Sequence, residues 1–170
     1  YATFARGGLY IEPYAFYKIE FQDENLDPVE IKPTPKKVME ESTAFIINMI
    51  LRYAVTSGSV GAGSVSGTDV CAKTGTSTVD SAAKKAAGIT GNLIGDSWEV
   101  AYSPDYAIST WYGYKTQLDP KYHLTSAEGG TARKTITKLL TSGILPKNST
   151  FKRPSTVSSV EVELGTDPLM

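Results

Sequence analysis

The sequence is poor in histidine and cysteine and contains no long apolar run. Its 170 residues include one histidine, His123, and one cysteine, Cys71, so it lacks a cluster of metal ligands and cannot form an internal disulfide. No run of about 18 apolar residues occurs, and the first residues have no basic-then-apolar signal pattern. A formal net charge of −1 gives no reason to expect nucleic acid or an anionic membrane as a partner. We therefore expect a globular domain with no metal and no cofactor, with Cys71 in the core and His123 on the surface.

The first third of the chain combines an aromatic segment with one amphipathic helix. Residues 9–21 alternate loosely between apolar and polar side chains, which predicts an edge hairpin or an extended arm, followed by a proline-rich linker. Over residues 36–56 apolar side chains recur at helical spacing, and Thr34-Pro35 resembles an N-cap with proline at the first helical position. Residues 57–64, SGSVGAGS, have too few apolar side chains to pack, so we expect a flexible loop there.

Three strands are predicted in the middle of the chain. Residues 68–76 begin with apolar side chains and are typical of a strand that starts in the core. Residues 98–102 and 106–112 show the period-2 pattern of strands, and the turn residues 103–105, Ser-Pro-Asp, join them as a hairpin. Three consecutive strands with short links favour an antiparallel sheet. With flanking helices, they predict an α+β fold.

Two further helices and a tail complete the predicted organisation. A short helix over residues 81–87 is expected to end before Gly88, and a last helix over residues 130–142 to end at Gly143. The apolar face of the last helix would consist of Ile136, Leu139 and Leu140. We expect residues 1–150 to belong to one domain and residues 151–170 to form an extended tail, or a linker to a following domain.

The segment VCAKTGTST, residues 70–78, places a lysine, a glycine and hydroxyls on the strand predicted over residues 68–76. Because residues two apart on a strand share a face, Thr74 and Thr76 present their hydroxyls together, with Lys73 and Gly75 on the other side. Two hydroxyls and a nearby ammonium can form a receptor for a carboxylate. Taken alone, K-T-G is a weak signal, because a solvated lysine among β-forming threonines explains it better.

Five sequence blocks in order give this motif a context. They are YATFARGG at 1–8, the helical segment 38–55 with Thr43-Ala44-Phe45, KTGT at 73–76, Asp96-Ser97-Trp98, and TWYGY at 110–114. Together they resemble the C-terminal half of the transpeptidase domain of a class A penicillin-binding protein from a Gram-positive bacterium. The implied fold is β-lactamase/transpeptidase-like and incomplete in this chain. Ala72, Glu99 and Ala101 depart from the family pattern, which commonly has glycine, phenylalanine and glycine there, so we expect different packing around the motif strand.

The resemblance implies a peptidoglycan D,D-transpeptidase that cross-links the cell wall through a seryl-acyl intermediate on D-Ala-D-Ala stem peptides and is acylated by β-lactams. Lys73 would supply charge and hydrogen bonds to the serine of an S-x-N motif, and Thr74 and Thr76 would bind the substrate carboxylate. Gly75 would leave room for the ligand, and the Thr76 backbone N–H would donate to the oxyanion. The resemblance also places the protein at the extracytoplasmic face of the bacterial membrane, held by an anchor outside this sequence.

The nucleophile of such a site has no candidate in this sequence. S-x-x-K occurs at Ser81 to Lys84 and at Ser149 to Lys152, but both follow the K-T-G box, whereas the family's serine precedes it. No S-x-N occurs. Because Tyr1 to Ala5 resemble the last turns of a helix, we expect a preceding segment. We predict that this chain works with an upstream segment of the same protein that carries S-x-x-K and S-x-N.

Two other functions stay open at this point. A serine β-lactamase shares the K-T-G box and would turn over a chromogenic β-lactam, because it deacylates quickly. A non-catalytic module would bind stem peptides or β-lactams without forming a covalent adduct, so penicillin labelling separates it from both enzymes.

Overall fold

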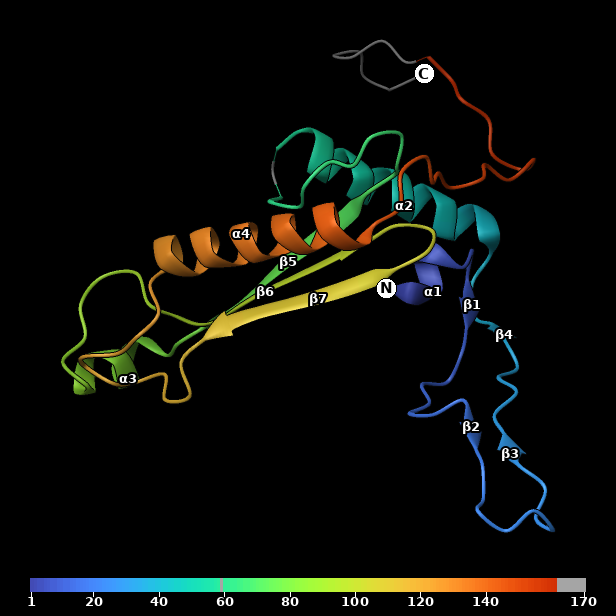
Figure 1. Ribbon diagram of the computed structural model, residues 1–170. Helices are drawn as coiled ribbons and strands as arrows, with labels where there is room; N and C mark the ends of the chain where they lie inside the picture. The colour runs from blue at the N-terminus through green and yellow to red at the C-terminus, as the bar shows by residue number, and fades with distance from the viewer. Residues whose placement is uncertain (59, 162–170) are drawn as a thin grey trace.

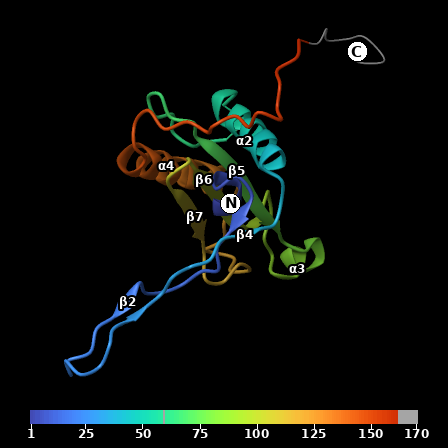
Figure 2. The same cartoon turned by 90° about the vertical axis from the view of Figure 1, so that its right-hand side faces the viewer.

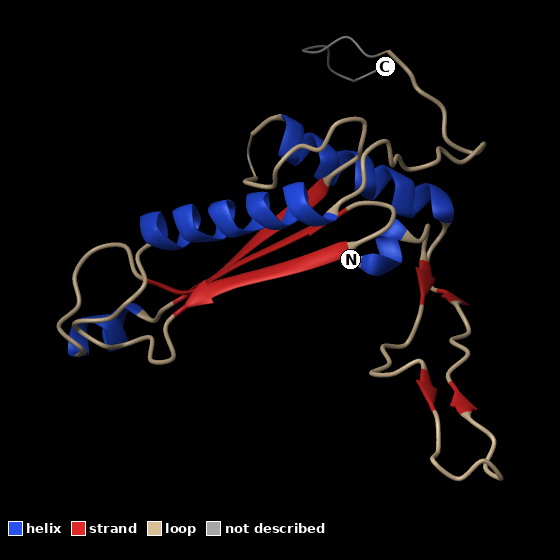
Figure 3. Ribbon diagram, in the orientation of Figure 1, coloured by secondary structure: helices blue, strands red, loops and turns tan. Residues whose placement is uncertain are grey.

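The computed structural model describes residues 1–58 and 60–161, which form a sheet flanked by helices and a long arm (Figure 1). The predicted tail residues 162–170 lie outside the described residues. Figure 3 marks the helices, which are α1 (Ala2–Ala5), α2 (Glu41–Thr56), α3 (Ser81–Ala86) and α4 (Ser126–Ile144). The strands are β1 (Leu9–Tyr10), β2 (Lys18–Ile19), β3 (Val29–Glu30), β4 (Lys36–Lys37), β5 (Cys71–Thr78), β6 (Ile94–Tyr102) and β7 (Ala107–Gly113).

The central sheet has three antiparallel strands in the order β5-β6-β7. Cys71 at the start of β5 lies opposite Tyr102 at the end of β6, which in turn lies opposite Ala107 at the start of β7. The turn between β6 and β7 is closed by a hydrogen bond of 2.9 Å from the Ser103 N–H to the Tyr106 carbonyl. The predicted α+β fold and its hairpin are therefore confirmed.

Helices cover both faces of this sheet (Figure 2). On one face, the buried Asn48 of α2 accepts a hydrogen bond of 2.8 Å from the Tyr102 hydroxyl, and its backbone carbonyl accepts one from the Cys71 thiol. On the other face, Thr110 of β7 lies against Thr137 of α4. Because neighbouring strand residues point to opposite faces, these contacts place α2 and α4 on opposite sides of the sheet.

Residues 9–37 form a narrow arm that projects from the sheet and its helices (Figure 1, Figure 2). β1 pairs with β4 and β2 pairs with β3, so the expectation of an extended arm is confirmed. The expected helix start at Thr34-Pro35 is wrong, because Lys36 and Lys37 pair with the first strand of the arm and α2 begins only at Glu41. The helical spacing of apolar residues extends back over Lys36 and Lys37, but pairing with β1 holds these residues in a strand.

The loop after α2 packs against the protein, contrary to the expectation that it has too little apolar surface to do so. Val60 is buried with Ala72 and Ala101 of the sheet. Gly61 lies so close to α4 that a Cβ added there would come within 2.1 Å of the Lys134 Cγ. The N–H of Gly63 donates a 3.1 Å hydrogen bond to the Thr141 hydroxyl. Small residues here allow the backbone to approach the helix, which a pattern of apolar side chains does not reveal.

Helix α4 is longer than predicted and buries polar residues beside its expected apolar face, of which Leu140 packs against a buried hydrophobic cluster. It begins at Ser126, where the Thr125 hydroxyl accepts a 3.2 Å hydrogen bond from the Glu128 N–H, and it continues through the expected stop at Gly143. Its buried residues are Gly129, Thr137 and Thr141, whereas Leu139 of the expected apolar face is 69% exposed. The face is polar because the sheet residues beneath it, Ser97, Glu99 and Thr110, are polar and buried.

The remaining connections agree more closely with the sequence. The short helix α3 ends at Ala86 and is followed by Gly88 with a φ of +69°, as its predicted role after the helix requires. Cys71 is buried as expected, and burial raises the pKa of its thiol to about 12. After α4 the chain continues without helix or strand through residue 161 and contacts the sheet, with the Phe151 ring 6.2 Å from that of Tyr102.

Candidate functional site

The four residues of the K-T-G-T motif lie in the middle of β5, which is an edge strand of the central sheet. Lys73, Gly75 and Thr76 are exposed, and Thr74 is half-buried. The strand begins in the core at Cys71 and emerges toward solvent along its length because helix α2 contacts its first residues. The motif therefore lies at an accessible edge of the sheet.

The register of the sheet determines which side chains accompany each motif residue. Thr74 lies opposite Glu99 and Thr76 opposite Ser97, whereas Gly75 lies opposite Trp98. Directly opposed residues of antiparallel strands point to the same face. Thr74 and Thr76 consequently share the face covered by α4, and Gly75 shares the other face with Trp98.

Lys73 donates a hydrogen bond of 2.8 Å from its ammonium to the Thr74 carbonyl. In an extended strand the N–H and C=O of one residue point to the same side, and this direction repeats every second residue. An exposed side chain can reach the Thr74 carbonyl, which indicates that the backbone groups of Thr74 and Thr76 face the open edge. This is the geometry in which a strand can bind the backbone or carboxylate of a ligand.

Gly75 has free space around it among the described residues. A Cβ added there would lie 3.5 Å from the Trp98 Cβ, which is an ordinary van der Waals contact. Trp98 is 46% exposed and its ring lies 6.3 Å from that of Trp111 on β7. Packing within the described residues does not demand a glycine at this position, so any need for one comes from what approaches the strand.

Behind the two threonines lies a buried polar layer that sequence reasoning did not assign to the site. Glu99 is fully buried, and its Oε2 lies 3.4 Å from Nε of Arg133 on α4. Burial raises the pKa of the Glu99 carboxyl, and the Arg133 guanidinium only partly opposes this shift. The signal in the sequence was a glutamate inside an apolar strand pattern, and its partner could not be identified without the fold.

The end of β5 is tied to its neighbours through Asp96 of β6. Its carboxylate accepts hydrogen bonds from the Ser77 hydroxyl at 2.8 Å, the Trp111 indole at 3.0 Å and the Gln117 amide at 3.1 Å. These donors hold the pKa of the Asp96 carboxyl below its usual value, with the Trp111 indole the largest contributor. The register between β5 and β6 shifts between Thr76 and Thr78, so this cluster anchors the strand where pairing is irregular.

Neither S-x-x-K string joins the motif in a catalytic arrangement. Lys84 donates to the Gly91 carbonyl at 2.5 Å, within the connection that follows β5. The Ser149 hydroxyl donates to the Asp105 carboxylate instead of contacting Lys152. Among the hydrogen bonds of residues 1–58 and 60–161, neither serine is paired with its lysine. Neither string is therefore arranged as a nucleophile with its base among the described residues.

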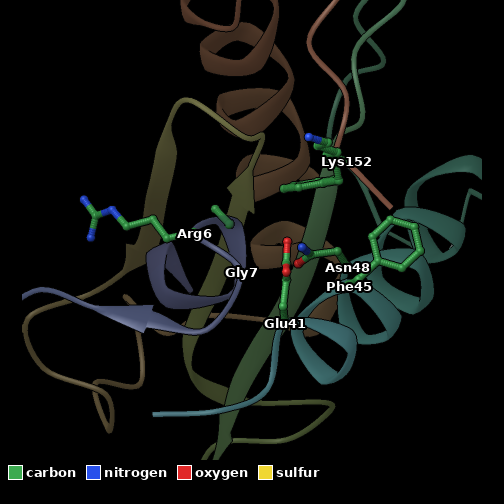
Figure 4. A pocket seen from close by; sticks show the side chains of 8 residues that line it. Arg6, Gly7, Glu41, Phe45, Asn48 and Lys152 are labelled. Carbon is green, nitrogen blue, oxygen red and sulfur yellow. The ribbon is translucent and has the colours of Figure 1, made fainter. Parts of the chain in front are cut away.

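A cavity of about 180 Å³ lies away from the motif, between α1, α2 and the C-terminal segment (Figure 4). Arg6, whose side chain points away from Glu41 and Lys152, lies at its rim (Figure 4). None of residues 73–76 lines this cavity. Its charged side chains are exposed at the surface, and its buried polar residue, Asn48, is already hydrogen-bonded to the Phe4 carbonyl and the Tyr102 hydroxyl, so the lining offers little to a ligand.

Within the described part of the chain, no three His, Cys, Asp or Glu side chains are grouped as a metal site would require. His123 lies in a loop, where its Nδ1 is 3.1 Å from the Asp119 carbonyl.

No helix among the described residues combines the length and apolar character that crossing a membrane requires.

Comparison with known proteins relates this arrangement to one family. A family model described as the penicillin binding protein transpeptidase domain matches residues 1–142. Penicillin-binding protein 1A/1B of Bacillus subtilis (strain 168) is 31% identical over 168 residues, which cover 99% of this chain and 18% of that protein. Penicillin-binding protein 1A of Streptococcus oralis is 29% identical over 121 residues, which cover 71% of this chain and 19% of that protein. The chain spans less than a fifth of the length of these relatives.

Proposed function

Because the chain belongs to the penicillin-binding protein transpeptidase family, we propose that it forms the carboxylate-binding wall of a peptidoglycan D,D-transpeptidase site. The family match agrees with the class A resemblance drawn from the sequence. The observation that carries the proposal is the exposure of Lys73, Gly75 and Thr76 on the open edge of β5, with Thr74 half-buried beside them. An edge strand with a cation and hydroxyls suits an extended peptide that ends in a carboxylate.

In this proposal each motif residue has a distinct part. The Thr74 and Thr76 hydroxyls hold the terminal carboxylate of an acyl-D-Ala-D-Ala stem peptide or of a β-lactam, while the Lys73 ammonium adds a favourable charge. Held in this way, the scissile carbonyl lies against the strand edge, where the Thr76 N–H can donate to the developing oxyanion. Gly75 has no side chain and so keeps the other face of the strand, next to Lys73, open to the approach of the ligand or of the upstream segment.

The nucleophile in this proposal is a serine of an S-x-x-K motif on an upstream segment of the same protein, with an S-x-N motif beside it. The serine hydroxyl attacks the carbonyl of the penultimate D-alanine, the terminal D-alanine leaves with the serine's proton, and an acceptor amine then releases the acyl group as a cross-link. With a β-lactam, the ring amide opens and the acyl-enzyme persists. This chemistry places the protein at the extracytoplasmic face of the cell membrane, where its peptidoglycan substrate lies.

Covalent labelling by penicillin tests the proposal in the full-length protein. We expect Thr74→Ala and Thr76→Ala each to slow acylation by about tenfold or more, because each removes one hydroxyl that orients the ligand. Thr78→Ala is the matched control, since Thr78 is exposed on the same strand beyond the register shift. Unchanged labelling rates in both motif variants would overturn the assignment of the wall.

The same sample separates the alternative functions. A transpeptidase keeps its acyl adduct, so intact-mass analysis detects the added penicillin long after mixing. Rapid loss of the adduct with turnover of a chromogenic β-lactam would instead identify a β-lactamase. Binding without any adduct would identify a non-catalytic module.

A further inference from the structure

Glu99 places a carboxylate between the sheet and α4, on the strand next to the proposed ligand wall. Its side chain is fully buried, and it lies opposite Thr74 of β5 on one side and Thr110 of β7 on the other. Opposed side chains point to the same face, so the carboxylate belongs to the same row of side chains as the Thr74 hydroxyl. A negative charge in this row opposes the binding of a substrate carboxylate unless a cation neutralises it.

Arg133 of α4 supplies that cation. Its side chain is 14% exposed, and its Nε lies 3.4 Å from the Glu99 Oε2. Its Nη1 also donates to the Ser97 hydroxyl at 3.3 Å, and Ser97 lies opposite Thr76. The guanidinium therefore contacts Glu99 and Ser97 from the side of α4, and these two residues lie opposite Thr74 and Thr76.

The contact between Glu99 and Arg133 is long for an ion pair between two buried charges. Among the described residues, neither Glu99 carboxylate oxygen nor the Arg133 Nε has a hydrogen-bond partner with ordinary geometry. Charge-assisted hydrogen bonds are usually about 2.7–2.9 Å long, shorter than the contact seen here. A buried pair with unmet hydrogen bonds is poorly suited to a purely stabilising role. The place of this pair next to Thr74 of the motif points to a function that uses the charge.

The other groups around Glu99 leave Arg133 as its main electrostatic partner. Lys134 of α4 and the Gly61 N–H of the preceding loop also favour the ionised carboxylate, but more weakly than burial opposes it, so that the pKa of Glu99 is raised. Thr110 and Thr137, which lie in the same layer, are neutral. Lys73 belongs to the other face of β5 because it lies opposite Val100.

We propose that Glu99 and Arg133 are positioning residues that set, through the proton on Glu99, how strongly Thr74 and Thr76 hold the carboxylate of the ligand. This inference rests on the proposed function. When Glu99 is ionised it cancels the charge of Arg133. When Glu99 takes up a proton, the guanidinium is left uncompensated behind the threonines and attracts the ligand carboxylate. Affinity for carboxylate-bearing ligands thus rises as the pH falls through the titration of Glu99.

A pair of probes isolates this effect. The full-length protein is acylated with benzylpenicillin and with its methyl ester, which lacks the negative charge, between about pH 5 and pH 8, where the free carboxylate stays ionised. The ratio of the two second-order acylation rates removes pH effects on the nucleophile and its base, because both probes share them. In the wild type we expect this acid-to-ester ratio to rise by about tenfold toward low pH.

Variants at the two positions give opposite expectations. Glu99→Gln removes the titrating group, so the ratio should be independent of pH and stay at the wild type's low-pH level. Glu99→Gln combined with Arg133→Gln removes both charges, so the ratio should be flat at the high-pH level. Arg133→Lys keeps the cation and should retain the rise. Lys138→Gln, which removes an exposed cation from α4, is the control and should keep the wild-type profile.

The outcomes separate this inference from the proposed function. If the wild type labels with penicillin but Glu99→Gln shows the same pH-dependent ratio, the inference is wrong and the proposed function stands. If the wild type is not labelled by either probe, the proposed function fails and this inference fails with it. Should Glu99→Gln lose its thermal unfolding transition, the double variant decides, and a ratio that still rises at low pH contradicts the inference.

Discussion

The hydroxyl oxygens of Thr110 on β7 and Thr137 on α4 lie 2.8 Å apart in a layer where both side chains are buried. Thr110 also donates to the Glu99 carbonyl at 3.2 Å, so the Thr137 hydroxyl is the donor between the two threonines. The contact links the helix to the sheet through hydrogen bonds where many domains use apolar side chains. It makes the register of α4 on the sheet specific, because a hydrogen bond tolerates less displacement than an apolar contact does.

Thr137→Val is expected to lower the free energy of unfolding by about 1–2 kcal/mol, because it leaves the buried Thr110 hydroxyl without its donor. Urea denaturation measures the change. Thr135→Val is the matched control, since Thr135 is exposed on the same helix and its hydroxyl only bonds the Thr131 carbonyl. Equal losses in the two variants would contradict the role of the buried contact.

Gly129→Ala and Gly130→Ala are expected to change stability in opposite directions. A Cβ at Gly129 would lie 3.0 Å from the Ser97 Cβ on β6, the central strand of the sheet, so this variant should lose about 1–3 kcal/mol. A Cβ at Gly130 meets nothing within 4 Å, and alanine in a helix gains about 1 kcal/mol over glycine. Thermal unfolding of both variants checks the prediction, and a stabilised Gly129→Ala would show that α4 can move off the sheet.

Tyr102→Phe should destabilise the fold by about 1–2 kcal/mol, because it deprives the buried Asn48 side chain of its donor. Asn48 also donates to the Phe4 carbonyl at 3.0 Å, so the loss should loosen the attachment of α1 as well. Unfolding free energies and amide exchange in residues 2–5 measure both effects. Tyr106→Phe, at a position 51% exposed, serves as control and should leave both unchanged.

The pH dependence of stability should contain a contribution from Glu99. Burial raises the pKa of this carboxyl above the ordinary value of 4.5, so the folded state binds the proton more tightly than the unfolded state. Its stabilising contribution is therefore full below the ordinary pKa and is lost as the pH rises through the raised pKa of the folded state. The difference in unfolding free energy between the wild type and Glu99→Gln, measured against pH, should follow this course. A difference that is constant with pH would show that Glu99 titrates normally.

Local patterns in the sequence determined the three-stranded antiparallel sheet, the turn between β6 and β7, and the short helix before Gly88. These features depend on alternation, turn chemistry and glycine conformation, each of which acts over a few neighbouring residues. Local patterns also predicted that Lys73 to Thr76 lie on a strand that leaves the core. The motifs of the sequence predicted the family to which the chain belongs.

Only the tertiary structure decided where α2 begins, which face α4 buries and what lies behind Thr74. Lys36 and Lys37 follow a helical pattern but are extended because a distant strand pairs with them. Leu139 is exposed and Thr137 buried because the sheet presents polar groups to the helix. Glu99 and Arg133 lie 34 positions apart in the sequence and meet only because β6 and α4 pack together. Such contacts depend on the relative placement of whole elements, which a pattern within one element cannot encode.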